Sequence, residues 1–347
     1  MFIVDNGSTM ITIRTQDGNN FTEIPHFKHG CWVDARNVTG EDLKRLEQDF
    51  GVEAELLTDI MDTDEQSRIE YEDEYTALIV RLPVYDGSYE ISCFTVPLGI
   101  VIFPDKIITV CQRTSEALDD ISANRVRGLV FRNTSAFVLN MLGRAAFAFL
   151  KSLKELNKNA NIIERQLQKS IRNNELIQLL SIQKSLVFFT TSIKTNELLL
   201  EKLKKSPLIR GNEEDEELLD DVMTENVQAL EMANIYSSIL TGTMDAFASV
   251  ISNNMNIVMK RLAIINIVLM IPTLIYSFYG MNVPLPGQHW PFAVLAIILG
   301  SLVIAGLGVI VLSIEGSYKQ INPPPKHKKH SIHPIHPTHR GKSIYHV

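Results

Sequence analysis

Two long apolar segments near the C-terminal end dominate the hydropathy pattern of the chain. Residues Leu262 to Phe278 form 17 positions without a charge, and residues Pro291 to Ile314 form 24. Both reach the length that a helix needs to cross roughly 30 Å of hydrocarbon, the first only with help from its flanking residues. A lipid-exposed backbone must satisfy its own hydrogen bonds, so each segment should be a helix. The pattern predicts a two-helix transmembrane hairpin.

The first part of the chain alternates between strand-like and helix-like patterns. The strand-like segments are rich in Val, Ile and Thr, and they are residues 10–15, 31–36, 76–85, 91–103 and 106–112. Thr39 to Asp42 predicts a capping box that opens a helix, and residues 53–62 predict a second helical segment. We therefore expect a cytosolic α+β domain over residues 1–132, whose strand order the pattern leaves open.

Long helices are predicted from about Ser135 onward. Pro207, Gly211 and an acidic cluster mark a break, after which only Gly242 interrupts helix formation from about Glu216 to Pro272. The last long helix should therefore run into the first membrane span. The expected segments are a long-helix and stalk region (133–259), a first transmembrane helix (260–282), an external loop (283–290), a second transmembrane helix (291–314) and a cytosolic tail rich in basic residues, His and Pro (315–347).

Charge around the hairpin predicts its orientation. Lys260 and Arg261 precede the first span, and several lysines follow the second, whereas the connection between the spans has neither Lys nor Arg. Both termini should therefore be cytoplasmic in a multi-pass protein of the cell's inner (plasma) membrane. The N-terminal segment lacks the basic start and apolar core of a cleaved signal peptide, so no such peptide is expected. The three cysteines fit reduced thiols.

Composition narrows the function classes. The formal net charge of −7 argues against a nucleic-acid partner. Neither a phosphate-binding glycine loop nor a nucleophile elbow is present, so an enzyme is not expected.

Polar residues follow one face of the first span. The residues of this stripe lie three or four positions apart: Asn256, Met259, Leu262, Asn266, Met270, Thr273, Ser277 and Gly280. Polar groups at membrane depth usually face a bundle interior or a water path. Ser and Thr can instead bond back to their own helix. The Asn266 side chain fits a contact between helices and a pore lining equally well.

These residues bring the chain close to a known family. Tyr279-Gly280-Met281-Asn282 resembles the signature of the CorA family of divalent-cation transporters. Asn256 to Leu262 is similar to the family's N-x-x-M-K-x-L segment. Residues 50–75 and 219–222 resemble further family segments, so the resemblance covers residues 30–315.

The resemblance implies a CorA-like homopentamer with a cytosolic funnel, which moves Mg²⁺, and with it Co²⁺ or Ni²⁺, through a pore lined by the first spans. Mg²⁺ gives up its waters reluctantly, and a ring of neutral Asn282 amides can accept hydrogen bonds from those waters. The selectivity filter that the resemblance implies consists of Gly280, Met281 and Asn282. Gly280 would permit a backbone turn, and Met281 would pack against neighbouring side chains.

The resemblance also assigns a gate and a regulatory site. Met259, Leu262 and Met270 match an apolar constriction, and Asn256 would form a polar ring at the cytosolic mouth. Asn266 departs from the family pattern, which leaves the position of the gate open. Asp59 and Asp221 match an acidic pair that binds regulatory Mg²⁺ between subunits, although a solvated surface carboxylate is the commoner role of such a residue.

The C-terminal tail carries a second metal-binding pattern. Its histidines recur every third residue among prolines: His327, His330, His333, His336 and His339. In a polyproline II segment this spacing aligns imidazoles that suit Zn²⁺, Ni²⁺ or Co²⁺. A basic tail beside anionic lipid is the plainer interpretation.

Two alternatives stay open. The chain could be a Zn²⁺ transporter of the same superfamily, which the histidine-rich tail favours and the intact Gly-Met-Asn opposes. It could also be a membrane-tethered scaffold without transport activity, but an anchor does not need a polar stripe. Uptake assays with different divalent ions distinguish a Zn²⁺ transporter from a Mg²⁺ transporter. Any ion flux through the purified protein excludes a scaffold without transport activity.

Overall fold

The computed structural model describes residues 10–17, 20–85, 93–126, 133–169, 173–209, 211–281 and 291–321. The chain divides into two compact units, one of residues 1–249 and one of residues 250–347. The first unit carries a β-sheet with its covering helices. The second carries the end of one long helix and the helix that follows it.

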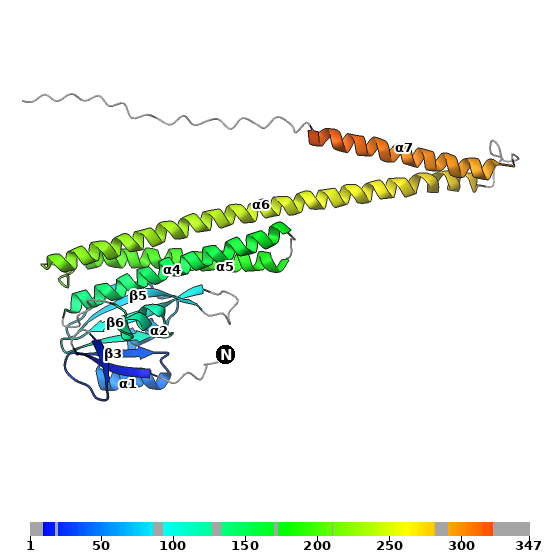
Figure 1. Ribbon diagram of the computed structural model, residues 1–347. Coiled ribbons are helices and arrows are strands. Elements are labelled where there is room, and N and C mark those ends of the chain that lie inside the picture. The colour runs from blue at the N-terminus through cyan, green and yellow to red at the C-terminus, as the bar shows by residue number, and fades with distance from the viewer. Residues whose placement is uncertain are drawn as a thin grey trace, which may run out of the picture. The chain divides into compact units, whose positions relative to one another are not determined.

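Seven strands form one mixed sheet in the order β2-β1-β3-β7-β6-β5-β4 (Figure 1). The strands are β1 (Met10–Asp17), β2 (Asn20–Ile24), β3 (Cys31–Arg36), β4 (Arg68–Tyr71), β5 (Thr76–Tyr85), β6 (Cys93–Ile102) and β7 (Lys106–Cys111). Among these strands β3 and β7 are the one parallel pair, and the others pair antiparallel. A parallel pair needs a long connection, and here it contains two helices and three strands.

Helices account for most of the rest of the described chain. They are α1 (Gly40–Phe50), α2 (Ala54–Met61), α3 (Glu116–Ser122), α4 (Thr134–Lys169), α5 (Asn173–Leu203), α6 (Glu213–Tyr279) and α7 (Ala293–Ile321). Both faces of the sheet are covered, because side chains of a strand point alternately to opposite faces. On β5, Leu78 and Val80 pack with α3, α4 and α5, whereas Ala77 and Ile79 pack with α1 and α2. Burial on both faces explains why β5 and β6 are mostly apolar.

Local signals fix α1 and α2 on their face of the sheet. The Thr39 hydroxyl accepts from the Asp42 amide at 3.4 Å, and the Asp42 carboxylate accepts from the Thr39 amide at 2.9 Å, which confirms the predicted capping box. α2 lies close to β6 at Gly99. A Cβ at that position would overlap the Cδ1 atom of Ile60, so the missing side chain permits the approach.

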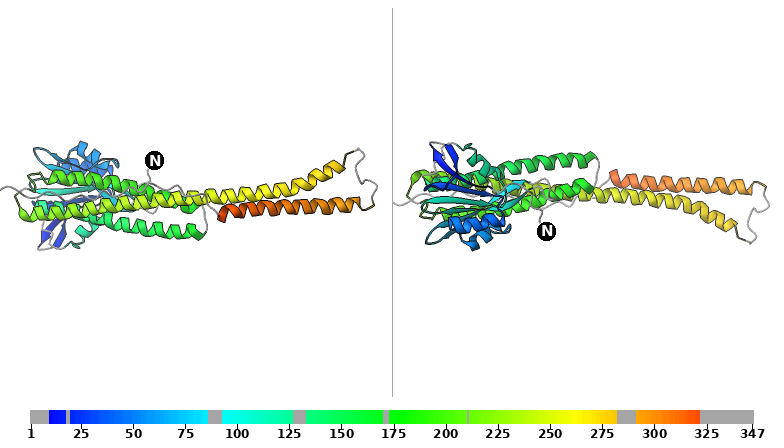
Figure 2. Two further views of the ribbon diagram at one scale, coloured as in Figure 1. Left: turned by 90° about the horizontal axis from the view of Figure 1, so that it is seen from above. Right: turned by 90° about the horizontal axis from the view of Figure 1, so that it is seen from below.

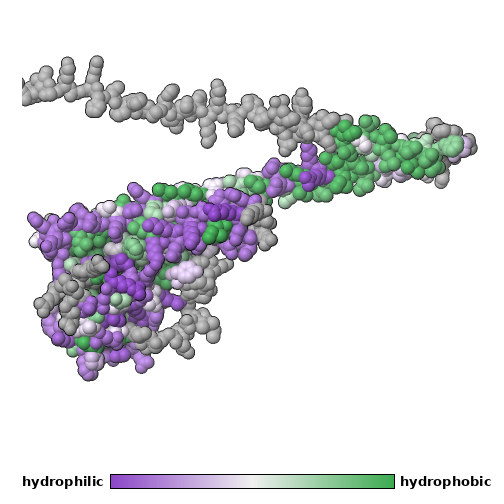
Figure 3. Space-filling model, viewed as in Figure 1, coloured by the Kyte–Doolittle hydropathy of each residue, from purple (hydrophilic) through white to green (hydrophobic). Residues whose placement is uncertain are grey.

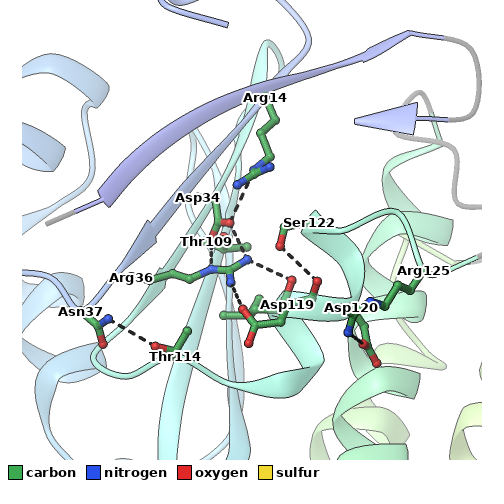
Figure 4. A network of polar contacts seen from close by, with 11 residues as sticks. Arg14, Asp34, Arg36, Asn37, Thr109, Thr114, Asp119, Asp120, Ser122 and Arg125 are labelled. Carbon is green, nitrogen blue, oxygen red and sulfur yellow. Dashed lines mark hydrogen bonds and ion pairs between the residues drawn. The ribbon is translucent and has the colours of Figure 1, made fainter. Parts of the chain in front are cut away.

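A buried polar network joins the sheet to α3 (Figure 4). Asp34 on β3 is 2% exposed and accepts from Arg36 at 2.9 and 2.6 Å. Arg36 also donates to Asp119 on α3 at 2.5 Å, and Thr109 on β7 donates to Asp34 at 3.3 Å. Because these buried polar groups satisfy one another's hydrogen bonds, the network stabilises the packing of α3 against the sheet.

The long helices share a second apolar core. Phe149 of α4 and Phe189 of α5 meet edge to face with ring centroids 5.2 Å apart, and Ala229 and Ala233 of α6 pack against the same cluster. α6 runs beside α4 and α5 over this core (Figure 2). This core anchors the first part of α6 in the first unit.

In the second unit α6 and α7 pack side by side. The hydroxyl oxygens of Tyr276 and Ser301 lie 3.0 Å apart, and a Cβ on Gly308 would lie 3.7 Å from Cδ1 of Ile271. Contacts that move up one helix as they move down the other define an antiparallel pair. Ser301 and Ala305, which are buried, give α7 a face of small residues toward α6.

Most predicted elements are confirmed, and the α+β domain and the long helices are present. The short strands β2 and β4 were not predicted from the sequence. The last long helix begins at Glu213 and continues seven residues beyond Pro272 to Tyr279. The predicted second span is part of a helix of 29 residues that reaches Ile321.

Candidate functional site: an exposed polar face on α6 and an acidic cluster beside α2

The predicted stripe lies on the face of α6 that points away from α7. The side of α6 nearest α7 is half-buried and consists of Ile264, Val268, Ile271, Pro272 and Ile275. At 100° per residue the stripe is centred about 170° from that side. All eight stripe residues, from Asn256 to Gly280, are exposed in the single chain. The structure therefore brings them together on one free surface.

Apolar surface gathers on the same part of the molecule (Figure 3). By length and composition, three described helices could span a membrane. The most apolar windows of α4 and α5 are 61% and 39% buried within the fold, whereas the window of α6 is 0% buried. α4 and α5 are thus core helices of the first unit. The end of α6 needs a bilayer or other chains to cover it.

The segment predicted to be a selectivity filter, residues 280–282, begins where α6 ends. The amide of Gly280 donates to the Tyr276 carbonyl at 2.9 Å, and the amide of Met281 donates to the Phe278 carbonyl at 3.4 Å. Gly280 is not among the described glycines with positive φ, so its backbone does not itself demand a glycine. A Cβ there would lie 3.3 Å from the Tyr276 carbonyl oxygen. Asn282 lies outside the described residues.

The polar stripe residues differ in how they are satisfied. Thr273 donates to the Leu269 carbonyl of its own helix at 2.7 Å, which is the back-bonding open to any helical Thr. Within the described residues no hydrogen bond engages the side chains of Asn256 or Asn266. Two amides on an exposed face are therefore available to water, to an ion's hydration shell or to another copy of the helix.

Asp59 lies in the last turn of α2 and is bound by an arginine. Nη2 of Arg68 donates to Asp59 at 2.6 Å, Nε donates to Glu70 at 2.5 Å, and Nη1 pairs with Glu65. Desolvation opposes the charged form of Arg68, but its three carboxylates outweigh it and raise the pKa of the guanidinium. Arg68 was not found from the sequence, although it is the one basic residue among nine acids between residues 54 and 75.

Asp221 is exposed near the start of α6. Its neighbours Leu219 and Val222 are buried in the cluster on the sheet face opposite α2. Burial raises the pKa of Glu225, and the charge of Asp221 one turn earlier adds to this rise. A single chain therefore does not bring Asp59 and Asp221 together. Among the described residues no group of three or more His, Cys, Asp or Glu side chains could hold a metal ion.

The five tail histidines lie outside the described residues.

Two buried polar residues near the acidic cluster were also missed. Arg81, 7% exposed, donates to the carbonyls of Thr63 and Glu65, and Asn196 of α5 bonds both the amide and the carbonyl of Arg81. An arginine inside an apolar strand and an asparagine inside a helix were the available signals.

Comparison with known proteins identifies the class. A model of the CorA-like Mg²⁺ transporter protein family matches residues 27–313. The chain belongs to this family of membrane transporters.

Individual relatives agree with the family match. The cobalt/magnesium transport protein CorA of Methanocaldococcus jannaschii is 26% identical over 256 residues, which cover 72% of this chain and 79% of the relative. The protein of the same name from Thermotoga maritima is 21% identical over 300 residues, which cover 83% and 82%. The complete structure of the CorA magnesium transporter from M. jannaschii matches with a TM-score of 0.74 at 23% identity, over 88% of this chain and 98% of that one, which shows the shared fold.

Proposed function

We propose that the chain is one subunit of a homopentameric, channel-like transporter that moves hydrated Mg²⁺ across the inner (plasma) membrane. The observation that carries the proposal is the exposed polar face of α6, opposite α7. Because α7 covers the other side of α6, this face is the one that copies of the helix can turn toward a common axis. Met259, Leu262 and Met270 would form the apolar gate, and Asn256 and Asn266 would form polar rings.

Selectivity in this proposal comes from Asn282, with Gly280 and Met281, at the outer end of the pore. Neutral amides can bind the water shell of Mg²⁺ without holding the ion so tightly that it cannot leave. Two relatives carry cobalt as well as magnesium in their names, which makes Co²⁺ the second ion to test. Zn²⁺ transport is the alternative, and the same assay separates it.

Regulation would take place between copies of the chain. Asp59 and Asp221 lie on helices that cover opposite faces of the sheet, so the Asp59 of one copy would meet the Asp221 of the next. A hydrated Mg²⁺ between them would offset the repulsion of the two carboxylates and stabilise a closed assembly. Falling internal Mg²⁺ would then favour opening.

The decisive test is ion flux through purified protein in liposomes, followed with a Mg²⁺-sensitive dye. We expect uptake by the native protein and its loss in Asn282→Ala and Asn266→Leu. Parallel measurements with Co²⁺, Ni²⁺ and Zn²⁺ define the ion. An absence of flux in the native protein would leave a membrane-tethered scaffold, and unchanged flux in both variants would contradict the pore assignment.

A further inference from the structure

We propose that Arg68 is a built-in counter-cation, which competes with a divalent ion for Asp59 and so sets the ion concentration at which the regulatory site fills. This inference deepens the proposed function and rests on its assignment of Asp59 to an ion site. It assigns to Arg68 the control of the site's threshold.

The contacts of Arg68 support competition at a single carboxylate. The guanidinium uses a different nitrogen for each of Asp59, Glu65 and Glu70. When an ion takes the Asp59 carboxylate, Arg68 keeps two of its three partners. Exchange at Asp59 therefore never leaves Arg68 without a counter-charge.

The position of Asp59 favours a cation there. Asp59 lies in the last turn of α2, where the helix dipole is negative and the helix has no basic residue of its own. The surrounding segment, residues 54–75, holds nine acids and Arg68 as its one base. Such a field attracts divalent ions in preference to monovalent ones, because the attraction scales with charge. Arg68 is thus the one basic side chain of its own segment that can stand in for the ion.

Arg68 is held in place by the elements behind it. The hydroxyl of Ser67 donates to Asn196 of α5 at 2.6 Å. The buried guanidinium of Arg81 donates to the carbonyls of Thr63 at 2.5 Å and Glu65 at 2.9 Å. The segment that presents Arg68 is therefore fixed to α5 and β5, whereas Asp59 belongs to α2. A fixed arginine competes at every encounter, unlike a freely moving surface side chain.

The size of the effect follows from exposure. The side chains of Arg68 and Asp59 are 24% and 36% exposed, so water weakens their attraction. Pairs of this kind shift an equilibrium by about two- to fivefold. We expect removal of the guanidinium to lower the half-saturating ion concentration by about that factor.

The experiment follows protection of the full-length chain from limited proteolysis as the Mg²⁺ concentration rises. Arg68→Gln should give protection at a Mg²⁺ concentration about two- to fivefold lower than the native chain needs. Arg68→Lys, which keeps the charge but loses the planar fork, should fall between the two. The matched control is Arg45→Gln, because Arg45 pairs with Asp49 on α1 at 3.9 Å and its loss changes net charge equally. The control should leave the concentration unchanged.

Each outcome decides between the claims. Protection that is lost in Asp59→Ala but does not shift in either Arg68 variant overturns the role of Arg68 and leaves the ion site standing. Protection unaffected by Asp59→Ala overturns the ion site itself. A shift equal to that of Arg45→Gln shows net charge alone at work and also overturns the proposal. If Arg68→Gln does not fold, Arg68→Lys supplies the same decision.

Discussion

The hydroxyl oxygens of Tyr276 and Ser301 lie 3.0 Å apart between α6 and α7. Ser301 donates its proton to the Ile298 carbonyl at 2.8 Å, so Tyr276 is the donor in the contact between the helices. The bond lies where α7 presents its buried small residues, Ser301 and Ala305. Packing and one hydrogen bond together hold the hairpin.

Substitutions at this contact should weaken the hairpin by different amounts. Tyr276→Phe removes only the hydrogen bond and should cost about 0.6 kcal/mol, the average for such bonds within membranes. Ser301→Leu places a large side chain in the closest part of the interface and should cost about 1–3 kcal/mol. Unfolding in detergent measures both values. Native stability in Ser301→Leu would show that α6 and α7 do not pack at this point.

Cysteine labelling should distinguish the two faces of α6. We expect a membrane-impermeant thiol reagent to modify Asn266→Cys and Thr273→Cys and to be slowed by Mg²⁺ in the pore. Ile264→Cys and Val268→Cys, on the side toward α7, should react far more slowly. Equal rates on both faces would contradict a water-filled path along the stripe.

The native cysteines should not obscure that measurement. Cys31, Cys93 and Cys111 are buried, and burial raises the pKa of Cys93 and of Cys111 to about 11. At pH 8 roughly one such thiol in a thousand is ionised, and the thiolate is the reactive form. The native chain should therefore stay unlabelled until it is unfolded. Rapid labelling of the folded native chain would contradict the burial of these thiols.

Glu225 should give the cytosolic unit a pH-dependent stability when no divalent ion is present. Glu225 is only partly shielded from water, but this desolvation and then the charge of Asp221 raise the pKa of its carboxyl, so the folded chain holds the proton more tightly than the unfolded chain. Its contribution is complete below the unfolded value, near pH 4, and is lost as the pH rises through the folded value. Glu225→Gln should therefore be more stable than the native chain at pH 7.5, by up to about 0.5 kcal/mol because the residue is exposed.

Thermal unfolding at several pH values checks this expectation. The advantage of Glu225→Gln should vanish near pH 4, and the exposed Glu231→Gln should show none. If Asp221 binds Mg²⁺ as proposed, added Mg²⁺ should reduce the advantage, because the ion would offset the negative charge that acts on Glu225. An advantage that grows toward low pH would contradict a raised pKa for Glu225 in the folded chain.

Asn196 should be among the costliest polar side chains to remove. It bonds the amide and carbonyl of Arg81 at 2.9 and 3.0 Å and accepts from Ser67. Asn196→Ala takes this partner from the backbone amide and carbonyl of the buried Arg81 and should cost about 2–3 kcal/mol, measured by chemical unfolding. The exposed Asn159→Ala on α4 is the control and should stay within about 0.5 kcal/mol. Similar values for the two variants would show that water replaces the lost bonds.

The sequence predicted those elements whose cause is local. Thr39 and Asp42 cap α1 through bonds three residues apart, and the β-branched runs of β5 and β6 need only burial to become strands. The strand order was out of reach, because the pairing of β3 with β7 depends on contacts about 75 residues apart. The short strands β2 and β4 form because the longer strands β1 and β5 provide partners for their backbone hydrogen bonds. The residues of β2 and β4 themselves carry no pattern that predicts this pairing.

The candidate site shows the same division. The spacing of the residues from Asn256 to Gly280 predicted that they share one face of a helix. The structure shows that this face points away from α7. The contacts of Arg68 with Asp59 were missed because they depend on how α2 and β4 lie relative to each other in the fold. The predicted first span, residues 260–282, already ran past Pro272, and α6 does continue to Tyr279: proline removes one bond to Val268, but the helix on each side supplies the rest.

The missing side chain at Gly99 reaches beyond the core. Ile60 occupies the space that a methyl group on β6 would need, and Asp59 is the next residue along α2. An alanine at this position would force the Ile60 side chain to shift, one residue from the Asp59 that pairs with Arg68. Under the proposed regulation, the response to internal Mg²⁺ would then depend in part on whether β6 carries a side chain at residue 99.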